Sequence, residues 1–355
     1  MTKTAAAAHK RIIYFDYLRI AAIGAVVVLH IAAQNWATVD VSSLTWAAFN
    51  TCDSLVRWGV PVFVMISGAL FLSKNQSISK IYKKNIPKIL LILLIWTSIY
   101  TLWHFLTTDS VISVKDFVIN LATGPFHLWF LYMLIGLYMV VPILKRIIED
   151  EKATRYFILL AFIFAFLIPE VLQLISFKSE LIADLIRKKV EIMRVFMVLG
   201  YTGYFTLGYY LNKKAIKKKT ELIIYIVGLA GVIFTIIATT ILSNKEGYAS
   251  PLFYDNLTVN VAAMGVAVFV FFKNHLNAEH GSKRVRKWVQ LLSRCSLGVY
   301  LVHIIVLEAF NCFGLNSLSM NPIFSIPLLT VLVLSISYTI SIALYKIPKI
   351  GQWIV

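Results

Sequence analysis

Two side chains that can carry charge, Arg19 and His30, lie inside the first long apolar segment of the chain. On an α-helix their spacing places them within about 20° of one face and about 16 Å apart along the axis. Ionisable groups inside a bilayer are costly, and each is a functional-site hypothesis by default. A neutral imidazole can take a proton from a hydroxyl, and a guanidinium can hold an anion. The stripe therefore predicts a lined cavity.

Each of these residues also has a purely structural interpretation. Arg19 could extend to the inner headgroups, with Asp16, one helical turn away, as a neutralising partner. His30 could be an interfacial residue near Trp36. Either residue alone fits both interpretations, and only the two together on one stripe favour a cavity.

A later apolar segment adds Tyr300, His303 and Glu308. If it runs in the same direction as the first, Glu308 lies at the depth of His30, with His303 a few residues deeper. A neighbouring carboxylate fixes the tautomer of a histidine and raises its basicity. We therefore expect His30 to be a general base that Glu308 or His303 orients.

A third apolar segment opens with His127 and Trp129 at a similar depth. We expect these two side chains and Tyr300 to contact substrate. The other aromatic residues near segment ends are interpreted as interfacial belts. No local spacing of His, Asp or Glu is typical of a metal site, so no metal is predicted.

These residues have to be positioned by membrane helices. The chain has 355 residues, of which 59% are hydrophobic, against roughly 45–50% in soluble domains. The apolar residues gather in runs near the about 20 residues that a helix needs to cross a bilayer. We predict an all-α, polytopic transmembrane helical bundle of about ten spans. The predicted spans are 13–33, 55–73, 87–106, 127–144, 156–175, 193–212, 222–243, 255–272, 295–312 and 323–345.

The pattern of charge orients this bundle. The net charge is +17, and most of the 34 Lys and Arg residues fall in alternate connectors, as the positive-inside rule describes. We expect both termini to be cytoplasmic, with an N-terminal tail at 1–12, one membrane-embedded domain at 13–345 and a C-terminal tail at 346–355. Basic residues that set topology also contact anionic lipids, so nucleic-acid binding is not predicted. The basic segment around 187–189 falls on the outer side and could form an interfacial amphipathic helix.

Four motifs, taken in order, resemble the integral-membrane acyltransferase-3 family, which O-acylates cell-surface polysaccharides and related glycans. The resemblance covers nearly the whole chain. The motifs are Asp16-x-x-Arg19 with His30 after ten further residues, the run from Pro61 to Ser67-Gly68, His127-Leu-Trp129, and Ser296-Leu-Gly-Val-Tyr300-Leu-Val-His303.

The resemblance implies a donor and an acceptor on opposite sides of a bacterial plasma membrane. Acyl-CoA, with acetyl as the acyl group, would donate from the cytoplasm to a hydroxyl of an extracytoplasmic or lipid-linked glycan. Arg19, with Asp16 beside it, would contact the donor, and His30 would serve the transfer.

The region after the second span departs from the family pattern. Many members carry an Arg-x-x-Arg pair there, associated with the donor. This chain has Lys83, Lys84 and Lys88 instead, which keep the charge but lose bidentate phosphate recognition. We expect these lysines, together with the basic cluster at 283–294, to attract the phosphates of coenzyme A.

Two questions stay open in the sequence. Transfer could be direct or could pass through an acyl-enzyme, and the lack of a Ser or Cys beside a base favours direct transfer. The main alternative function is a transporter or exporter of a glycan or small solute, which intramembrane Arg and His would suit. No inverted repeat and no paired broken helices support that alternative.

Overall fold

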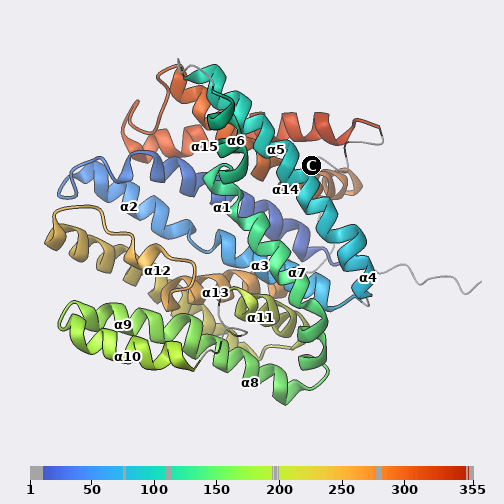
Figure 1. Cartoon of the computed structure of the whole chain (residues 1–355), viewed down its shortest axis with the longest axis vertical. Helices are drawn as coiled ribbons and strands as arrows, with labels where there is room; N and C mark the ends of the chain where they lie inside the picture. Colours follow the sequence, from blue (N-terminus) through green and yellow to red (C-terminus); the bar gives the residue numbers. More distant parts are fainter. Residues whose placement is uncertain are drawn as a thin grey trace, which may run out of the picture.

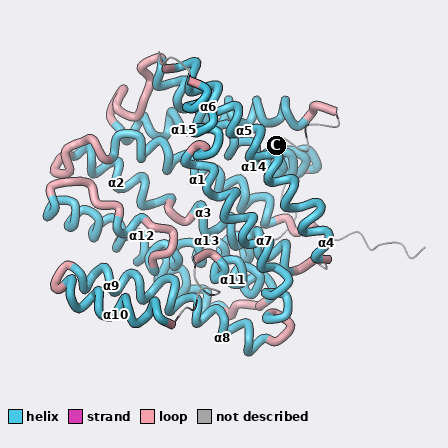
Figure 2. Tube along the Cα trace, viewed as in Figure 1, coloured by secondary structure: helices cyan, strands magenta, loops and turns pink. Residues whose placement is uncertain are grey.

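The structure is a computed structural model that describes residues 11–74, 77–108, 113–193, 195, 198, 200–276, 282–348 and 351. This part of the chain is built from helices joined by short loops, with no strand (Figures 1 and 2). Nine of its helical segments are long and apolar enough to cross a membrane. The predicted all-α polytopic bundle is therefore confirmed.

Fifteen α-helices and four shorter helical turns follow one another along the described chain. The α-helices are α1 (Tyr14–Trp36), α2 (Leu44–Val56), α3 (Gly59–Leu72), α4 (Ile78–Lys80), α5 (Ile86–Thr107), α6 (Val114–Thr123), α7 (Trp129–Ile147), α8 (Glu151–Ala161), α9 (Ile168–Ser176), α10 (Glu180–Ile192), α11 (Thr202–Lys213), α12 (Lys218–Glu246), α13 (Val259–His275), α14 (Lys283–Cys312) and α15 (Pro322–Tyr345). The shorter turns are η1 (Ile81–Asn85), η2 (Phe126–Leu128), η3 (Phe162–Leu167) and η5 (Leu252–Tyr254).

The predicted span at 193–212 has a different form from the other nine. Its helix, α11, covers only Thr202–Lys213, which is too short to cross a bilayer alone. After α9, the chain turns back along that helix as α10 (Figure 1). Lys214, directly after α11, forms an ion pair with Glu151 at the start of α8. The chain has therefore returned to the end of the bundle where α8 began, and α10 and α11 together make a tenth, interrupted passage.

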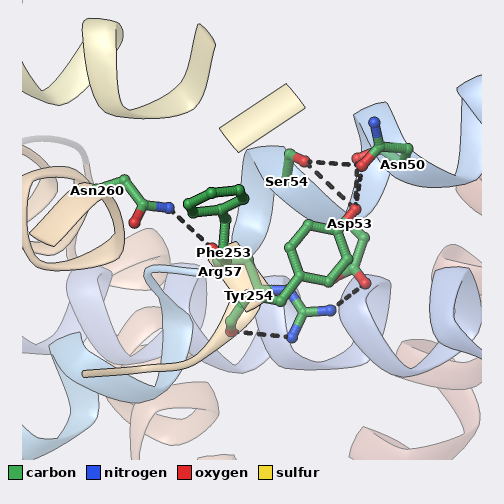
Figure 3. A network of polar contacts seen from close by, with 7 residues as sticks. All are labelled: Asn50, Asp53, Ser54, Arg57, Phe253, Tyr254 and Asn260. Carbon is green, nitrogen blue, oxygen red and sulfur yellow. Dashed lines mark hydrogen bonds and ion pairs between the residues drawn. The ribbon is translucent and has the colours of Figure 1, made fainter. Parts of the chain in front are cut away.

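The second predicted span begins earlier than expected. The prediction of 55–73 treated the polar residues before it as a connector, but α2 already starts at Leu44 and continues into α3 after a short turn. Asp53 is fully buried in α2 and pairs with Arg57, one turn further on (Figure 3). The Arg57 guanidinium also lies 3.8 Å from the centre of the Tyr254 ring. Because these groups satisfy one another, the membrane segment can include them.

The same network joins α2 to α12. The Asn50 amide donates hydrogen bonds to the Ile236 carbonyl (3.1 Å) and the Thr240 hydroxyl (2.8 Å). The Tyr254 hydroxyl donates in turn to the Asn50 side chain, and Arg57 donates to the Tyr254 carbonyl at 3.3 Å (Figure 3). Helices in a bilayer gain little from apolar contact alone, so such interhelical hydrogen bonds help to set which helices pair.

Small residues bring α3 and α11 into direct backbone contact. A Cβ atom added at Gly68 would overlap the main chain of Phe205, and one added at Gly208 would overlap the main chain of Met65. Gly68 and Gly208 therefore allow the close packing of these two helices.

Helix α1 lies at the centre of the bundle. It packs against α2, α3, α13, α14 and α15, and Leu18, Ala22, Ile23, Val27 and Ile31 on it are fully buried. Its neighbour α14 runs parallel to it. Near their starts, Ser293 donates a hydrogen bond to Asp16 at 2.7 Å, and near their ends the His30 and His303 rings lie 5.1 Å apart. This pairing fixes the site described below.

We predict that Asp53→Asn destabilises the protein by about 3–5 kcal/mol, because it leaves the Arg57 charge buried without its counter-ion. Thermal or denaturant unfolding of the detergent-solubilised protein would measure the loss. The double variant Asp53→Leu with Arg57→Met should lose less than the sum of the two single variants. Additive losses would show that the ion pair does not couple these residues.

Candidate active site

Three histidine rings from different elements meet in the interior of the bundle. His30 lies on α1, His303 on α14, and His127 on the single turn η2 that leads into α7. The ring centroids of His303 are 5.1 Å from His30 and 5.7 Å from His127. His303 is therefore the middle ring of the group, which we call the histidine cluster. The structure therefore brings together the three histidine side chains that the sequence placed at similar depths.

The backbone of α14 fixes the tautomer of His303. Its Nδ1 lies 2.8 Å from the Tyr300 carbonyl and 3.2 Å from the Val299 carbonyl. Carbonyl oxygens only accept, so Nδ1 carries the proton and Nε2 keeps its lone pair. That Nε2 is buried and has no hydrogen-bond partner among the described residues. His303 thus presents an acceptor to the space between the rings.

His127 is held by aromatic neighbours and not by its own nitrogens. The side chain is 2% exposed, and neither ring nitrogen has a hydrogen-bond partner in the described part of the chain. Its ring packs 4.7 Å from Tyr100 and 5.9 Å from Tyr300. The Tyr300 hydroxyl donates to the His127 backbone carbonyl. A buried imidazole with two free nitrogens is costly unless a ligand or water meets it, which marks this position as a binding surface.

A cavity of about 290 Å³, which we call the histidine cavity, leads from this cluster toward the start of α1. His30 and His127 lie at one end of it, and Arg19 lies about three turns away on α1. The expected substrate contacts Trp129 and Tyr300 also line it, as do Ser67, Ser293, Arg294 and Ser296. The prediction that Arg19 and His30 share one lined cavity is therefore confirmed.

Asp16 has a different partner from the one expected. It forms an ion pair with Arg11 (2.6 Å) and accepts a hydrogen bond from Ser293, and it makes no ion pair with Arg19. The reason is that Ser293 on α14 brings its hydroxyl to the Asp16 carboxylate, while Arg11, just before α1, brings its guanidinium. The Arg19 guanidinium, in contrast, has no hydrogen bond or ion pair with a described residue. It is therefore available to an anion in the cavity.

Glu308 also has a different partner from the one expected. Its carboxylate accepts a hydrogen bond from the Trp103 indole at 2.8 Å and has no contact with His30 in the described structure. Glu308 lies five positions after His303 on α14, and that spacing turns the two side chains about 140° apart around the helix. His303, not Glu308, is therefore the side chain placed to orient His30.

Glu308 instead lines a second cavity of about 410 Å³, which we call the distal cavity. It lies between the ends of α5, α6 and α14, beyond the histidine cluster. Two of its lining residues touch the cluster: the Phe126 ring is 5.7 Å from that of His30, and Tyr100 packs on His127. A single layer of aromatic side chains thus lies between the distal cavity and the histidine cluster.

The lysines expected to hold the donor lie outside both cavities. Lys83 and Lys84 are exposed on η1, and Lys88 is half-buried in the first turn of α5. Another basic pocket, of about 360 Å³, is lined by Arg11, Lys283, Arg286 and Lys287 near the start of α14. Basic side chains therefore surround the end of the bundle toward which the histidine cavity points.

Sequence reasoning missed the wall of the distal cavity. Trp103 was taken as a residue of an interfacial belt, and Asn120 and Asn311 carried no motif. It also missed that Asp53 and Arg57 lie inside a membrane segment, although an acid and a base one helical turn apart in an apolar run are a recognisable signal.

Cys52, Cys295 and Cys312 are free thiols. The described residues hold no group of three or more His, Cys, Asp or Glu side chains placed to bind a metal.

The fold defines the protein as a polytopic integral membrane protein, and the histidine cluster lies buried inside its helical bundle. The chain belongs to the acyltransferase-3 family, because the model of that family's acyltransferase domain matches residues 12–345. It is therefore an acyltransferase, which needs an acyl donor and an acceptor. No curated protein and no solved structure matches the chain significantly.

We predict that Tyr300→Phe lowers acyl transfer roughly ten- to hundredfold, because the lost hydroxyl frees the His127 carbonyl and a shift of about 1 Å at a reacting group can cost that much. Stability should fall by only about 0.5–1.5 kcal/mol, as for one hydrogen bond. The rate and the melting temperature are measured on the same preparation. Tyr338→Phe is the matched control, since that buried hydroxyl has no partner among the described residues. Equal rates in both variants would contradict the role of Tyr300.

Proposed function

We propose that the protein transfers an acyl group, acetyl in the simplest case, from cytoplasmic acyl-CoA to a hydroxyl of an extracytoplasmic or lipid-linked glycan. One observation carries the proposal: the histidine cluster lies between two cavities that approach it from opposite ends of the bundle. Two substrates that never share a compartment need such an arrangement. The positive-inside pattern supports a cytoplasmic location for the basic end, and the family resemblance favours a bacterial plasma membrane.

The donor would enter from the basic end. Coenzyme A carries several phosphate charges, which basic side chains attract. Arg19 and Arg294 line the histidine cavity and suit phosphate binding there. The acyl end of the donor would then reach His30. Lys83, Lys84 and Lys88 would act at longer range, as a positive surface that raises the local donor concentration.

His30 would act as the general base. As the acceptor hydroxyl attacks the thioester carbonyl, the imidazole takes the hydroxyl proton. The new ester C–O bond forms, the C–S bond breaks, and the leaving coenzyme A thiolate takes that proton from the His30 imidazolium, which restores the neutral base. His303 would orient His30, since its free Nε2 can accept a hydrogen bond from the protonated nitrogen of the His30 ring.

The hydrogen bonds of the cavity serines favour direct transfer over an acyl-enzyme. Ser67 donates to the Phe63 carbonyl, Ser293 to Asp16, and Ser296 to the Ser293 carbonyl. None of these hydroxyls is bonded to an imidazole in the described structure, so none has the activating base that a nucleophilic serine needs.

We predict that His30→Ala lowers acyl transfer about 10²–10⁴-fold, the usual contribution of a general base. The measurement is thiol release from acetyl-CoA by the purified protein, with and without glycan acceptors. His275→Ala is the control, because that histidine pairs with Glu221 away from the site. Full activity in the His30→Ala variant would contradict the catalytic role of His30. If well-folded wild-type protein neither releases thiol nor binds coenzyme A, that result would favour the alternative function, a transporter of a glycan or small solute.

We predict that Arg19→Met weakens acetyl-CoA binding roughly tenfold or more, because a charge-assisted hydrogen bond contributes about 1.5–3 kcal/mol. The triple variant Lys83→Gln, Lys84→Gln, Lys88→Gln should weaken binding mainly at low salt, since exposed charges are screened. Calorimetry at two salt concentrations separates these effects. If only the lysine variant loses affinity at both concentrations, the phosphate site belongs to the lysines.

A further inference from the structure

The distal cavity has the chemistry of a sugar site. Its wall combines a partly exposed aromatic plate, the Trp103 indole, with hydrogen-bonding groups from three elements, and its volume of about 410 Å³ falls within the usual range for small-molecule sites. An amphipathic ring packs on the C–H face of a sugar, while carboxylates and amides bond its hydroxyls. The polar groups on its wall are Thr101, His104, Thr107, Asn120, Glu308 and Asn311.

Glu308 is an exposed residue on this wall, and one hydrogen bond orients its side chain. Its Oε2 accepts the Trp103 hydrogen bond, and its Oε1 has no partner among the described residues. A carboxylate oxygen held this way can accept hydrogen bonds from one or two hydroxyls. The bond also locks the indole, so the aromatic plate and the acceptor oxygen form one preorganised unit.

The described wall of the cavity holds one carboxylate, that of Glu308, and no lysine or arginine; the imidazole of His104 lies on the same wall. An anionic sugar would therefore meet a like charge with no lysine or arginine to offset it, whereas a neutral or amino sugar would not. The histidine cavity, lined by Arg19 and Arg294, has the opposite character. Each cavity thus rejects the charge that the other accepts.

From these observations we propose that the distal cavity is the acceptor subsite and that Glu308 makes it select uncharged or amino-bearing glycans over glycans that carry carboxylates. The identification as an acceptor subsite rests on the proposed function. The contact of Phe126 with His30 and of Tyr100 with His127 sets a bound sugar one side-chain layer from the proposed base. Glu308 is a specificity-determining residue in this scheme and takes no part in proton transfer.

A cysteine on the wall of the distal cavity allows sugar binding to be tested without measuring acyl transfer. Cys312 lines the distal cavity and is exposed, Cys295 is buried, and Cys52 is half-buried. In a Cys52→Ser background, the rate of Cys312 alkylation by N-ethylmaleimide reports occupancy of the cavity. The probes are a neutral glucose trisaccharide, a glucosamine trisaccharide and a galacturonic acid trisaccharide, each at the same millimolar concentrations. Every rate is divided by that of the same variant without sugar.

We expect the neutral and amino trisaccharides to slow alkylation at concentrations at least tenfold lower than the galacturonic acid trisaccharide needs. Glu308→Gln should remove most of this difference, and Glu308→Lys should reverse it. Asp40→Asn is the matched control, because Asp40 is an exposed carboxylate in the loop after α1 and should leave the order unchanged. Equal protection by all three sugars, or protection by none, would overturn the inference.

Thiol release from acetyl-CoA in the same preparation separates this inference from the proposed function. Thiol release that depends on His30, without sugar protection of Cys312, would leave the enzyme intact and place its acceptor elsewhere. Charge-selective protection without thiol release or coenzyme A binding would leave a glycan-binding cavity and remove the proposed acyl-CoA reaction.

Discussion

The parallel pairing of α1 with α14 is the contact on which the rest of the structure depends. Buried polar groups in a membrane bundle are stable only when they face one another or a cavity. The bond between Asp16 and Ser293 meets this condition at one end of the pair, and the His30 and His303 rings face each other at the other. Between these two points, side chains of both helices line the histidine cavity. The other helices then surround this pair.

Much of this fold follows from the sequence because the bilayer leaves few solutions. A helix has to be long and apolar to cross, so the spans could be predicted from composition alone. Two errors arose where polar residues satisfy one another locally. The buried pair of Asp53 and Arg57 let α2 begin well before the expected boundary, and the passage predicted as one span at 193–212 is divided between α10 and α11.

The site was predictable where it rests on one helix and unpredictable where it rests on contacts between helices. The spacing of Arg19 and His30 fixed their common face, and the structure places both on one cavity. The partners of Asp16 and Glu308 could not be derived, because they depend on Ser293 and Trp103, which come from other helices. The orientation of α14 about its own axis decides that His303, and not Glu308, faces His30. That orientation is set by the packing of α14 against its neighbouring helices.

The layer formed by Tyr100 and Phe126 has a consequence for energetics across the bilayer. If donor and acceptor approach that layer from their own sides and meet only at their reacting atoms, an acyl group moves one way and the hydroxyl hydrogen moves the other, so no net charge crosses. A membrane potential does work of about 2.3 kcal/mol per elementary charge per 100 mV, so it does none on this step. Transfer would then proceed at the same rate in energised and de-energised membranes, with no coupling ion, and the thioester alone would supply the driving force.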